Sequence, residues 1–103
     1  MKKGKWTFLT NHGRVLIYIA KHPQSTTQKT AEKMGVTLRT VQKIISDLEI
    51  DGYLARQKNG RKNTYLINNK MPLRHRLEQD HVVGDILDAL GTEKPFKRLR
   101  QSE

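Results

Sequence analysis

Cysteine is absent from this chain of 103 residues, and long apolar runs are absent as well. Without cysteine there are no disulfides, no thiolate metal sites and no cysteine nucleophile. No apolar stretch approaches the roughly 20 residues that a membrane-spanning helix needs. The N-terminus, MKKGKW, is basic but lacks the apolar segment of a signal peptide. We therefore expect an intracellular protein that does not enter a membrane.

Acidic residues are scarce in one part of the chain only. Residues 1–70 hold 14 Lys and Arg but 4 Asp and Glu, a net charge of +10. Residues 71–103 hold 6 of each sign, so the whole excess of the chain lies in the first part. Such a concentration of positive charge predicts a polyanionic partner. The alternative is a basic surface that only keeps the protein soluble.

The length suits one domain with an added helix. We divide the chain into a basic N-terminal lead-in at residues 1–9, a main domain at residues 10–70, a C-terminal helix at residues 71–91 and a basic, flexible tail at residues 92–103. The lead-in also carries apolar side chains that we expect to cover a core or a partner. These are Trp6, Phe8 and Leu9.

The main domain is predicted to begin with a helix at residues 12–21. Thr10 or Asn11 can cap it, because either side chain offers an oxygen to the first free N–H groups. The helix is apolar nearly all round, which predicts a central, buried position. It ends at His22-Pro23, since the residue before proline avoids helical geometry.

Two further helices follow with a tight turn between them. Thr27 is the expected cap of a helix at residues 28–34, and Gly35 supplies its left-handed end. Thr37 caps the next helix, at residues 38–51. The second helix has one apolar face at three- and four-residue spacing. That face comprises Leu38, Val41, Ile44, Ile45 and Leu48.

A basic β-hairpin is predicted next, with strands at residues 53–58 and 61–67. Asn59-Gly60 joins them, and this dipeptide favours a hairpin turn because both positions need positive φ. Residues 24–26 are predicted as a short edge strand. A helix–turn–helix followed by a cationic hairpin is an order typical of proteins that bind DNA.

The outward face of the second helix predicts which residues would contact DNA. Arg39 suits bidentate contact with guanine, and Gln42 suits an adenine edge. Thr37 and Thr40 suit phosphate or a thymine methyl group, and Lys43 suits base or phosphate. The acids fall in the C-terminal half, where they would repel phosphate, so DNA should meet the N-terminal half and its favourable dipole. The alternative is an ordinary solvated face.

The hairpin offers a second set of cations. They are Arg56, Lys58, Arg61 and Lys62. Arginine at a hairpin tip suits a narrow minor groove, where the negative potential is highest. The alternative is a charged hairpin that only prevents edge-to-edge pairing.

The last helix is predicted at residues 72–90, with Pro72 at its start and Gly91 at its end. Its apolar arc includes Leu73 and Leu77 and is wider than one core requires. We therefore expect a homodimer. The predicted interface comprises Val83, Ile86, Leu87 and Leu90. The alternative is a helix packed on its own domain.

The segment TTQKTAEKMGVTLRTVQKIISDLEIDGYLARQKNGRKNTYLI resembles the winged helix-turn-helix of MarR- and ArsR-type transcriptional regulators. The resemblance covers residues 12–67 and extends to residues 72–90. It implies a dimeric, repressor-like DNA-binding protein. It places Thr37, Arg39, Thr40 and Lys43 at major-groove positions, and Arg61 and Lys62 at the tip of the wing.

Two differences from those regulators limit what the chain should sense. It has no cysteine ligands, which excludes thiolate metal sensing. It is also shorter than a typical MarR-type protein, whose flanking helices help to build an effector pocket, so no small-molecule effector is expected. His81 and Asp85 share a helical face, but no third ligand is evident and we predict no metal. Because no nucleophile–base pair or phosphate loop occurs, we expect neither a cofactor nor an enzyme.

The sequence thus predicts an α+β fold: a winged helix-turn-helix with a three-helix core, a small antiparallel β-wing and a C-terminal dimerisation helix. The predicted function is sequence-specific binding of double-stranded DNA in transcriptional regulation. The expected location is the cytoplasm, in association with the nucleoid. Two alternatives remain, a non-specific chromatin or RNA-binding protein and a winged-helix module for protein interactions.

Overall fold

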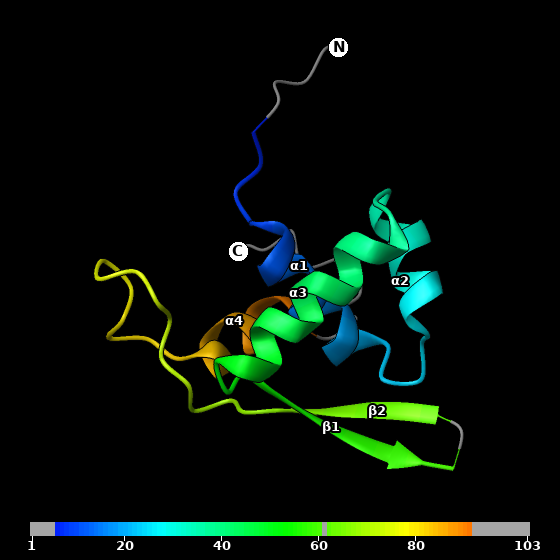
Figure 1. Cartoon of the computed structure of the whole chain (residues 1–103). Coiled ribbons are helices and arrows are strands. Elements are labelled where there is room, and N and C mark those ends of the chain that lie inside the picture. Colours follow the sequence, from blue (N-terminus) through cyan, green and yellow to red (C-terminus); the bar gives the residue numbers. More distant parts are fainter. Residues whose placement is uncertain (1–5, 61, 92–103) are drawn as a thin grey trace, which may run out of the picture.

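A computed structural model describes residues 6–60 and 62–91 of the chain (Figure 1). The described part is α+β, with four helices and a two-stranded antiparallel sheet. In chain order the elements are α1 (Asn11–Lys21), α2 (Thr27–Met34), α3 (Leu38–Ile50), β1 (Leu54–Asn59), β2 (Lys62–Ile67) and α4 (Val83–Leu90). This order is compatible with a winged helix. The lead-in residues 1–5 and the predicted tail at residues 92–103 lie outside the described residues.

Threonine side chains begin the first three helices. Of the two caps that the sequence allowed, Thr10 caps α1, with its Oγ1 accepting from the N–H of Gly13 at 3.1 Å. Thr26 caps α2, with its Oγ1 accepting from the N–H of Lys29 at 3.0 Å. The prediction of Thr27 as this cap was wrong by one residue. A hydroxyl at position 26 reaches the third helical N–H, so the helix starts at Thr27.

The turn between α2 and α3 forms as predicted. Gly35 ends α2 in the left-handed conformation, with φ 72° and ψ 32°. A side chain would be strained at that φ, whereas glycine adopts it freely. Thr37 then has extended backbone and caps α3. Residues 35–37 therefore turn the chain sharply and set the angle at which α3 leaves α2.

The core is built around α3, which lies across α1 and α2 (Figure 1). Most of its apolar face is buried as predicted, and Val41 at its centre and Val15 of α1 are both fully buried. The buried hydrophobic residues are Val15, Leu16, Ile19, Ala31, Val41, Ile44, Ile45, Leu48, Tyr53, Leu54 and Val83. The prediction that the first helix is buried nearly all round was wrong, because Ile17 and Tyr18 are only half-buried.

The hairpin pairs Leu54 with Ile67 at one end and Asn59 with Lys62 at the other. The predicted turn at Asn59-Gly60 was therefore wrong by one residue, since Asn59 belongs to the ladder and Gly60 begins the loop. Gly60 has φ 62°. One glycine at the first loop position can supply positive φ, so Asn59 can stay extended.

The predicted edge strand at residues 24–26 does not form within the described chain. These residues belong to the connection between α1 and α2, where the N–H of Ser25 donates to the carbonyl of His22 at 3.0 Å. The connection lies beside β2 and lines a small pocket together with Asn63, Thr64 and Tyr65. The turn holds the backbone away from the extended form that strand pairing requires.

The predicted helix at residues 72–90 was wrong in its first half, because α4 begins only at Val83. Residues 72–82 form a loop that projects from the body of the molecule (Figure 1). Pro72 forms an antiparallel bridge with Val82, and the N–H of Leu73 donates to the carbonyl of His81 at 3.0 Å. Leu77 is exposed at the end of this loop, so the predicted stripe through Leu73 and Leu77 does not exist.

Tertiary contacts explain why this loop is not helical. The hydroxyl of Tyr53 donates to the carbonyl of Pro72 at 2.6 Å. The N–H of Val83 donates to the carbonyl of Met71 at 2.8 Å. Both ends of the loop are thus held on the core, and a helix through residues 72–82 would break these bonds.

The predicted dimer residues on α4 have different environments. Val83 is 2% exposed and belongs to the core of its own chain, so its placement at a dimer interface was wrong. Ile86 and Leu87 are half-buried, and Leu90 is 44% exposed. The helix ends at Gly91 as predicted, where a Cβ would lie 2.7 Å from the carbonyl oxygen of Leu87. Glycine is therefore required there for space.

Candidate nucleic-acid interface

The predicted contact residues lie on the first half of α3 and on the residue before it. Thr37, Arg39, Gln42 and Lys43 are exposed, and Thr40 is half-buried. They lie opposite the buried face formed by Val41, Ile44, Ile45 and Leu48. The helix thus presents its polar N-terminal half outward while its apolar face holds it on the core.

Thr37 and Thr40 form a small hydroxyl pair at the N-terminus of α3. The Oγ1 of Thr37 accepts from the backbone N–H of Thr40 at 3.1 Å. The two Oγ1 atoms lie 2.9 Å apart, so one hydroxyl donates to the other. This pair fixes the first turn of α3. The positive end of the helix dipole lies at the same place, which favours an anion there.

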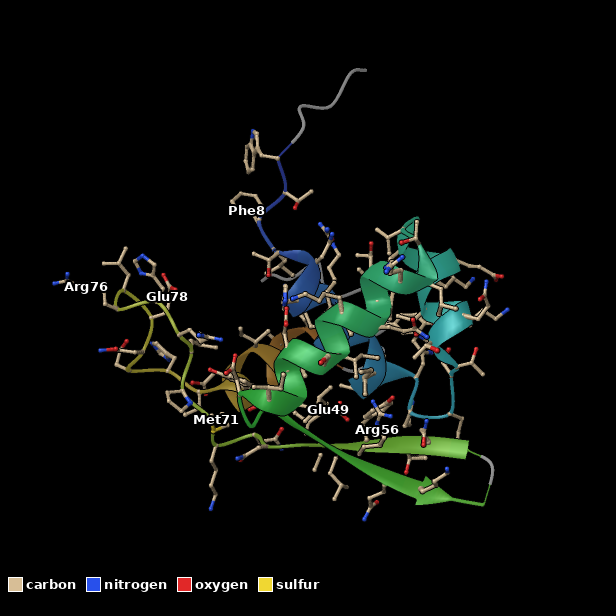
Figure 2. All side chains as sticks on the ribbon, in the orientation of Figure 1. Phe8, Glu49, Arg56, Met71, Arg76 and Glu78 are labelled. Atoms are coloured by element: carbon tan, nitrogen blue, oxygen red, sulfur yellow. The ribbon has the colours of Figure 1, made fainter. Side chains whose placement is uncertain are left out.

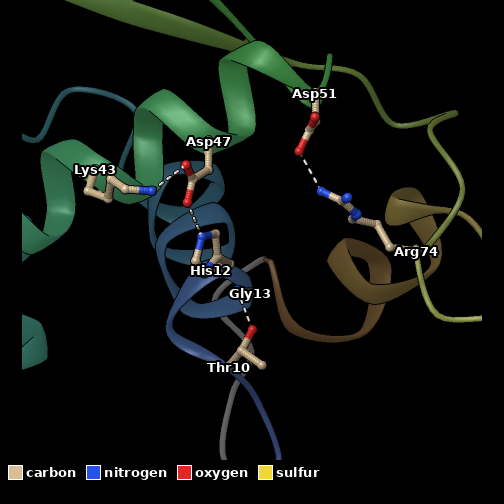
Figure 3. Close-up of polar contacts among 7 residues, drawn as sticks. All are labelled: Thr10, His12, Gly13, Lys43, Asp47, Asp51 and Arg74. Carbon is tan, nitrogen blue, oxygen red and sulfur yellow. Dashed lines mark hydrogen bonds and ion pairs between the residues drawn. The ribbon is translucent and has the colours of Figure 1, made fainter.

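Lys43 is engaged within α3 itself. Its Nζ donates to Oδ1 of Asp47 at 2.9 Å, while Oδ2 of Asp47 lies 2.8 Å from Nε2 of His12 in α1 (Figure 3). The hydrogen bonds from His12 and Lys43 hold the pKa of Asp47 below its ordinary value. Because Lys43 stays largely exposed, its ammonium group can turn to another anion.

Arg56 points from β1 toward the C-terminal half of α3 (Figure 2). Its Nε and Nη2 donate to the two carboxylate oxygens of Glu49 at 2.9 and 3.1 Å. The guanidinium also lies over the ring of Tyr65, at 5.8 Å from its centroid. The bond to Glu49 raises the pKa of Arg56, and burial raises the pKa of Tyr65. Arg56 therefore ties the hairpin to α3.

The third acid, Asp51 at the C-terminal cap of α3, accepts a hydrogen bond from Nη1 of Arg74 in the projecting loop (Figure 3). Asp47, Glu49 and Asp51 are thus all paired, and their partners come from three other segments as well as from α3. The sequence did not reveal this, because the partners from other segments lie between 7 and 35 residues away along the chain.

The structure describes the side chains of two of the four hairpin cations, Arg56 and Lys58. Arg56 and Lys58 are two residues apart on β1, so they share one face of the hairpin. Lys58 is exposed. Lys62 begins β2, but its side chain lies outside the described atoms. Arg61 lies outside the described residues.

The N-terminal half of α3 and the ends of β1 and β2 next to the loop both lie toward the right of the view in Figure 1. The projecting loop at residues 72–82 lies on the opposite side, beyond the C-terminal end of α3. The paired acids of α3 stand between these two sides. This arrangement gives α3 an N-terminal half that presents cations and a C-terminal half whose charges are already neutralised.

Among residues 6–60 and 62–91 no group of three or more His, Cys, Asp or Glu side chains is placed to hold a metal ion. His81 and Asp85 do contact each other, with Nδ1 and Oδ2 at 3.1 Å, and Asp85 also accepts from the N–H of Val82 at 3.0 Å. None of the described helices has the length and apolar character to cross a membrane.

The chain matches no protein-family model and no curated protein sequence. The likeness to MarR- and ArsR-type regulators therefore stays a prediction from the sequence pattern.

Proposed function

We propose that this chain is a winged-helix protein that binds double-stranded DNA in a sequence-specific manner and regulates transcription as a homodimer. One observation carries the proposal. The half of α3 that presents Arg39, Gln42 and Lys43 outward is also the half that lacks acids, while the three acids of the other half are paired within the protein. The cytoplasm, at the nucleoid, is the location that fits this function.

In this proposal α3 enters the major groove with its N-terminal half. Arg39 makes a bidentate contact with guanine and Gln42 with adenine. The capped first turn, with Thr37 and Thr40, lies against phosphate, where backbone N–H groups and the helix dipole favour the negative charge. Lys43 exchanges Asp47 for a phosphate or a base edge.

The hairpin makes the second contact. Arg56 donates two hydrogen bonds to Glu49, and this ion pair helps to fix the angle between the hairpin and α3. The DNA-facing cations are then Lys58, Arg61 and Lys62, closer to the tip. Their charge suits the backbone or a narrow minor groove. Their role is to add affinity on any sequence, whereas Arg39 and Gln42 supply discrimination.

Selection of bound sequences from a pool of random duplexes tests the proposal. We expect enrichment of one motif with two-fold symmetry, because a C2 dimer presents two copies of α3 about 34–36 Å apart, one turn of B-DNA. Binding without any enriched motif would support the non-specific alternative. The absence of binding to any duplex at low salt would contradict DNA binding altogether and leave the protein-interaction module.

A further inference from the structure

The carboxylate of Asp47 on α3 is shared by two nitrogen donors (Figure 3). Its Oδ1 accepts from Nζ of Lys43, which lies on the same helix, at 2.9 Å. Its Oδ2 lies 2.8 Å from Nε2 of His12 on α1. A histidine ring can donate from this nitrogen whether it is neutral or protonated. Lys43, a proposed DNA contact, is therefore linked through Asp47 to a titratable group on another helix.

The net charge of these three side chains depends on one proton. With His12 neutral, the charges of Lys43 and Asp47 cancel. With His12 protonated, the imidazolium balances the carboxylate, and the positive charge of Lys43 is left in excess. Histidine is the side chain whose ordinary charge change falls between pH 5 and 8. The proton on His12 is therefore the one that can change this local charge near neutral pH.

The other charged or titratable side chains around His12 come from α1, from the link between α3 and β1, and from the projecting loop. They are Arg14, Asp51, Tyr53, Arg74 and Glu78. Asp51 is paired with Arg74, and the hydroxyl of Tyr53 donates to a backbone carbonyl. The side chains that α4 adds to this surface are apolar. Among the described residues, Asp47 is the one side chain within hydrogen-bond distance of the His12 ring, so a proton on His12 acts first on Asp47.

The contact between Lys43 and Asp47 is easily exchanged. The side chain of Lys43 is 73% exposed, whereas that of Asp47 is 33% exposed. Exposed ion pairs are weak, so a phosphate can replace the carboxylate as the partner of the ammonium group. If His12 is neutral when this happens, Asp47 is left as an unbalanced negative charge next to the DNA. A protonated His12 removes that repulsion.

We propose that His12 is a positioning residue for Lys43: when its ring takes up a proton, it balances Asp47, releases Lys43 and raises the affinity of α3 for DNA. This role of His12 rests on the proposed function and adds a dependence on pH. By linkage, affinity falls as the pH rises through the range in which the ring loses its proton. The expected change is about 1.5- to 5-fold for each protomer bound, the size of one exposed ion pair.

The affinity for the selected duplex, measured between about pH 5.5 and 8 at constant ionic strength, tests this role. His12→Gln should lose the dependence on pH that the ring supplies. The matched control is His22→Gln, an exposed histidine after the other end of α1, whose ring lies beside Tyr18. This control should keep the dependence of the wild type. A His12→Gln variant that follows the wild-type profile would overturn the proposal.

Two further variants separate this role from a merely structural one. If the bond from His12 to Asp47 only holds α1 on α3, Asp47→Asn should weaken DNA binding. We expect the opposite: Asp47→Asn should bind more tightly than the wild type at pH 8, because Lys43 is then free at every pH. Weaker binding by this variant, with native helix content by circular dichroism, would overturn the proposal.

Lys43→Gln tests whether His12 acts through Lys43 or through its own charge. This variant should bind more weakly than the wild type, and its affinity should no longer depend on the proton of His12. If Lys43→Gln keeps the full dependence on pH, His12 attracts DNA directly and the proposal is wrong.

Nuclear magnetic resonance of the free protein tests the link without DNA. The carbon-13 signal of Lys43 Cε and the ring signals of His12 should follow one titration curve, and the Lys43 signal should stay constant in His12→Gln. A constant Lys43 signal in the wild type would overturn the proposal. No duplex binding at any pH would refute the proposed function together with the effect on DNA, and a joint titration would then leave the link between His12 and Lys43 standing. Duplex binding whose dependence on pH survives in His12→Gln would refute only the role of His12.

Discussion

Glu49 on α3 and Arg56 on β1 form a two-bond ion pair, with Arg56 Nε and Nη2 2.9 and 3.1 Å from the carboxylate oxygens of Glu49. The pair joins the proposed recognition helix to the hairpin that follows it. Because the guanidinium also lies over Tyr65 of β2, one side chain connects α3 with both strands. The angle between helix and hairpin is therefore set by this contact as well as by the buried Leu54.

Arg56→Ala should lower the free energy of unfolding by about 0.5–1 kcal/mol, the upper part of the range for partly exposed ion pairs. We expect a value in the upper part of this range because the ion pair is bidentate and the guanidinium also contacts Tyr65. Lys58→Ala, two residues further along the same face, should change stability little. Urea unfolding followed by circular dichroism measures both, and a double-mutant cycle with Glu49→Gln isolates the pair. A coupling energy near zero would show that the pair does not hold the hairpin.

Asp47 predicts a dependence of stability on pH in the acid range. Hydrogen bonds from His12 and Lys43 lower its pKa in the folded state below the value of 3.8 expected in the unfolded chain. The stabilisation is therefore present above pH 3.8 and is lost as the pH falls through the lower folded pKa. Asp47→Asn should make the free energy of unfolding fall less steeply below about pH 4.

The matched control for this prediction is Asp88→Asn on α4, an exposed aspartate that forms no ion pair with another described residue. Unfolding curves between neutral pH and pH 2.5 are compared at low and high salt. The difference between wild type and Asp47→Asn should shrink at high salt, because exposed charges are screened. If both variants follow the wild-type profile at low salt, Asp47 does not contribute in this way.

Local sequence signals predicted the parts of the fold that depend on local physics. The first three helices, the turn at Gly35, the caps at Thr10 and Thr37, and the hairpin follow from capping, periodicity and glycine conformation. The errors at Thr26 and Asn59 are shifts of one residue. The first occurred because the neighbours Thr26 and Thr27 offer the same capping hydroxyl, and the second because Gly60 alone supplies the positive φ at the start of the loop.

Long-range contacts determine the two features that the sequence did not predict, the loop at residues 72–82 and the ion pairs of the acids on α3. Residues 72–82 have leucines at helical spacing, yet the bond from Tyr53 to Pro72 and the bridge from Pro72 to Val82 hold them as a loop. The acids of α3 were expected only to repel phosphate. Their pairing with His12, Arg56 and Arg74 depends on segments that meet only in the folded chain.

Arg39→Ala should reduce affinity for the selected DNA site by about 1–3 kcal/mol, the range for loss of one bidentate base contact. It should relax preference at one base pair and leave binding to random duplex almost unchanged. Arg76→Ala is the matched control, since it removes the same side chain from the projecting loop on the other side of the molecule (Figure 2). Fluorescence anisotropy with both duplexes checks this. Equal losses on the selected and random duplexes would reduce Arg39 to a phosphate contact.

Arg61→Ala with Lys62→Ala should weaken binding to all duplexes to a similar degree. Log affinity falls with log salt concentration, and each lost phosphate contact reduces the steepness of this fall by about 0.9. Affinities measured at four or more salt concentrations give this slope. Arg56→Ala is the informative comparison, because its guanidinium is held by Glu49 and the slope should stay close to that of the wild type. A double variant with an unchanged slope would show that the hairpin tip does not contact DNA.

The central claim is that DNA meets the N-terminal half of α3 and the hairpin tip. Titration of isotope-labelled protein with the selected duplex, followed by nuclear magnetic resonance of the backbone amides, tests it residue by residue. We expect the largest shifts at residues 37–43 and 58–62, and no shift at residues 73–81. Shifts confined to residues 73–81 and α4 would place the nucleic acid on the opposite side of the molecule and contradict the account.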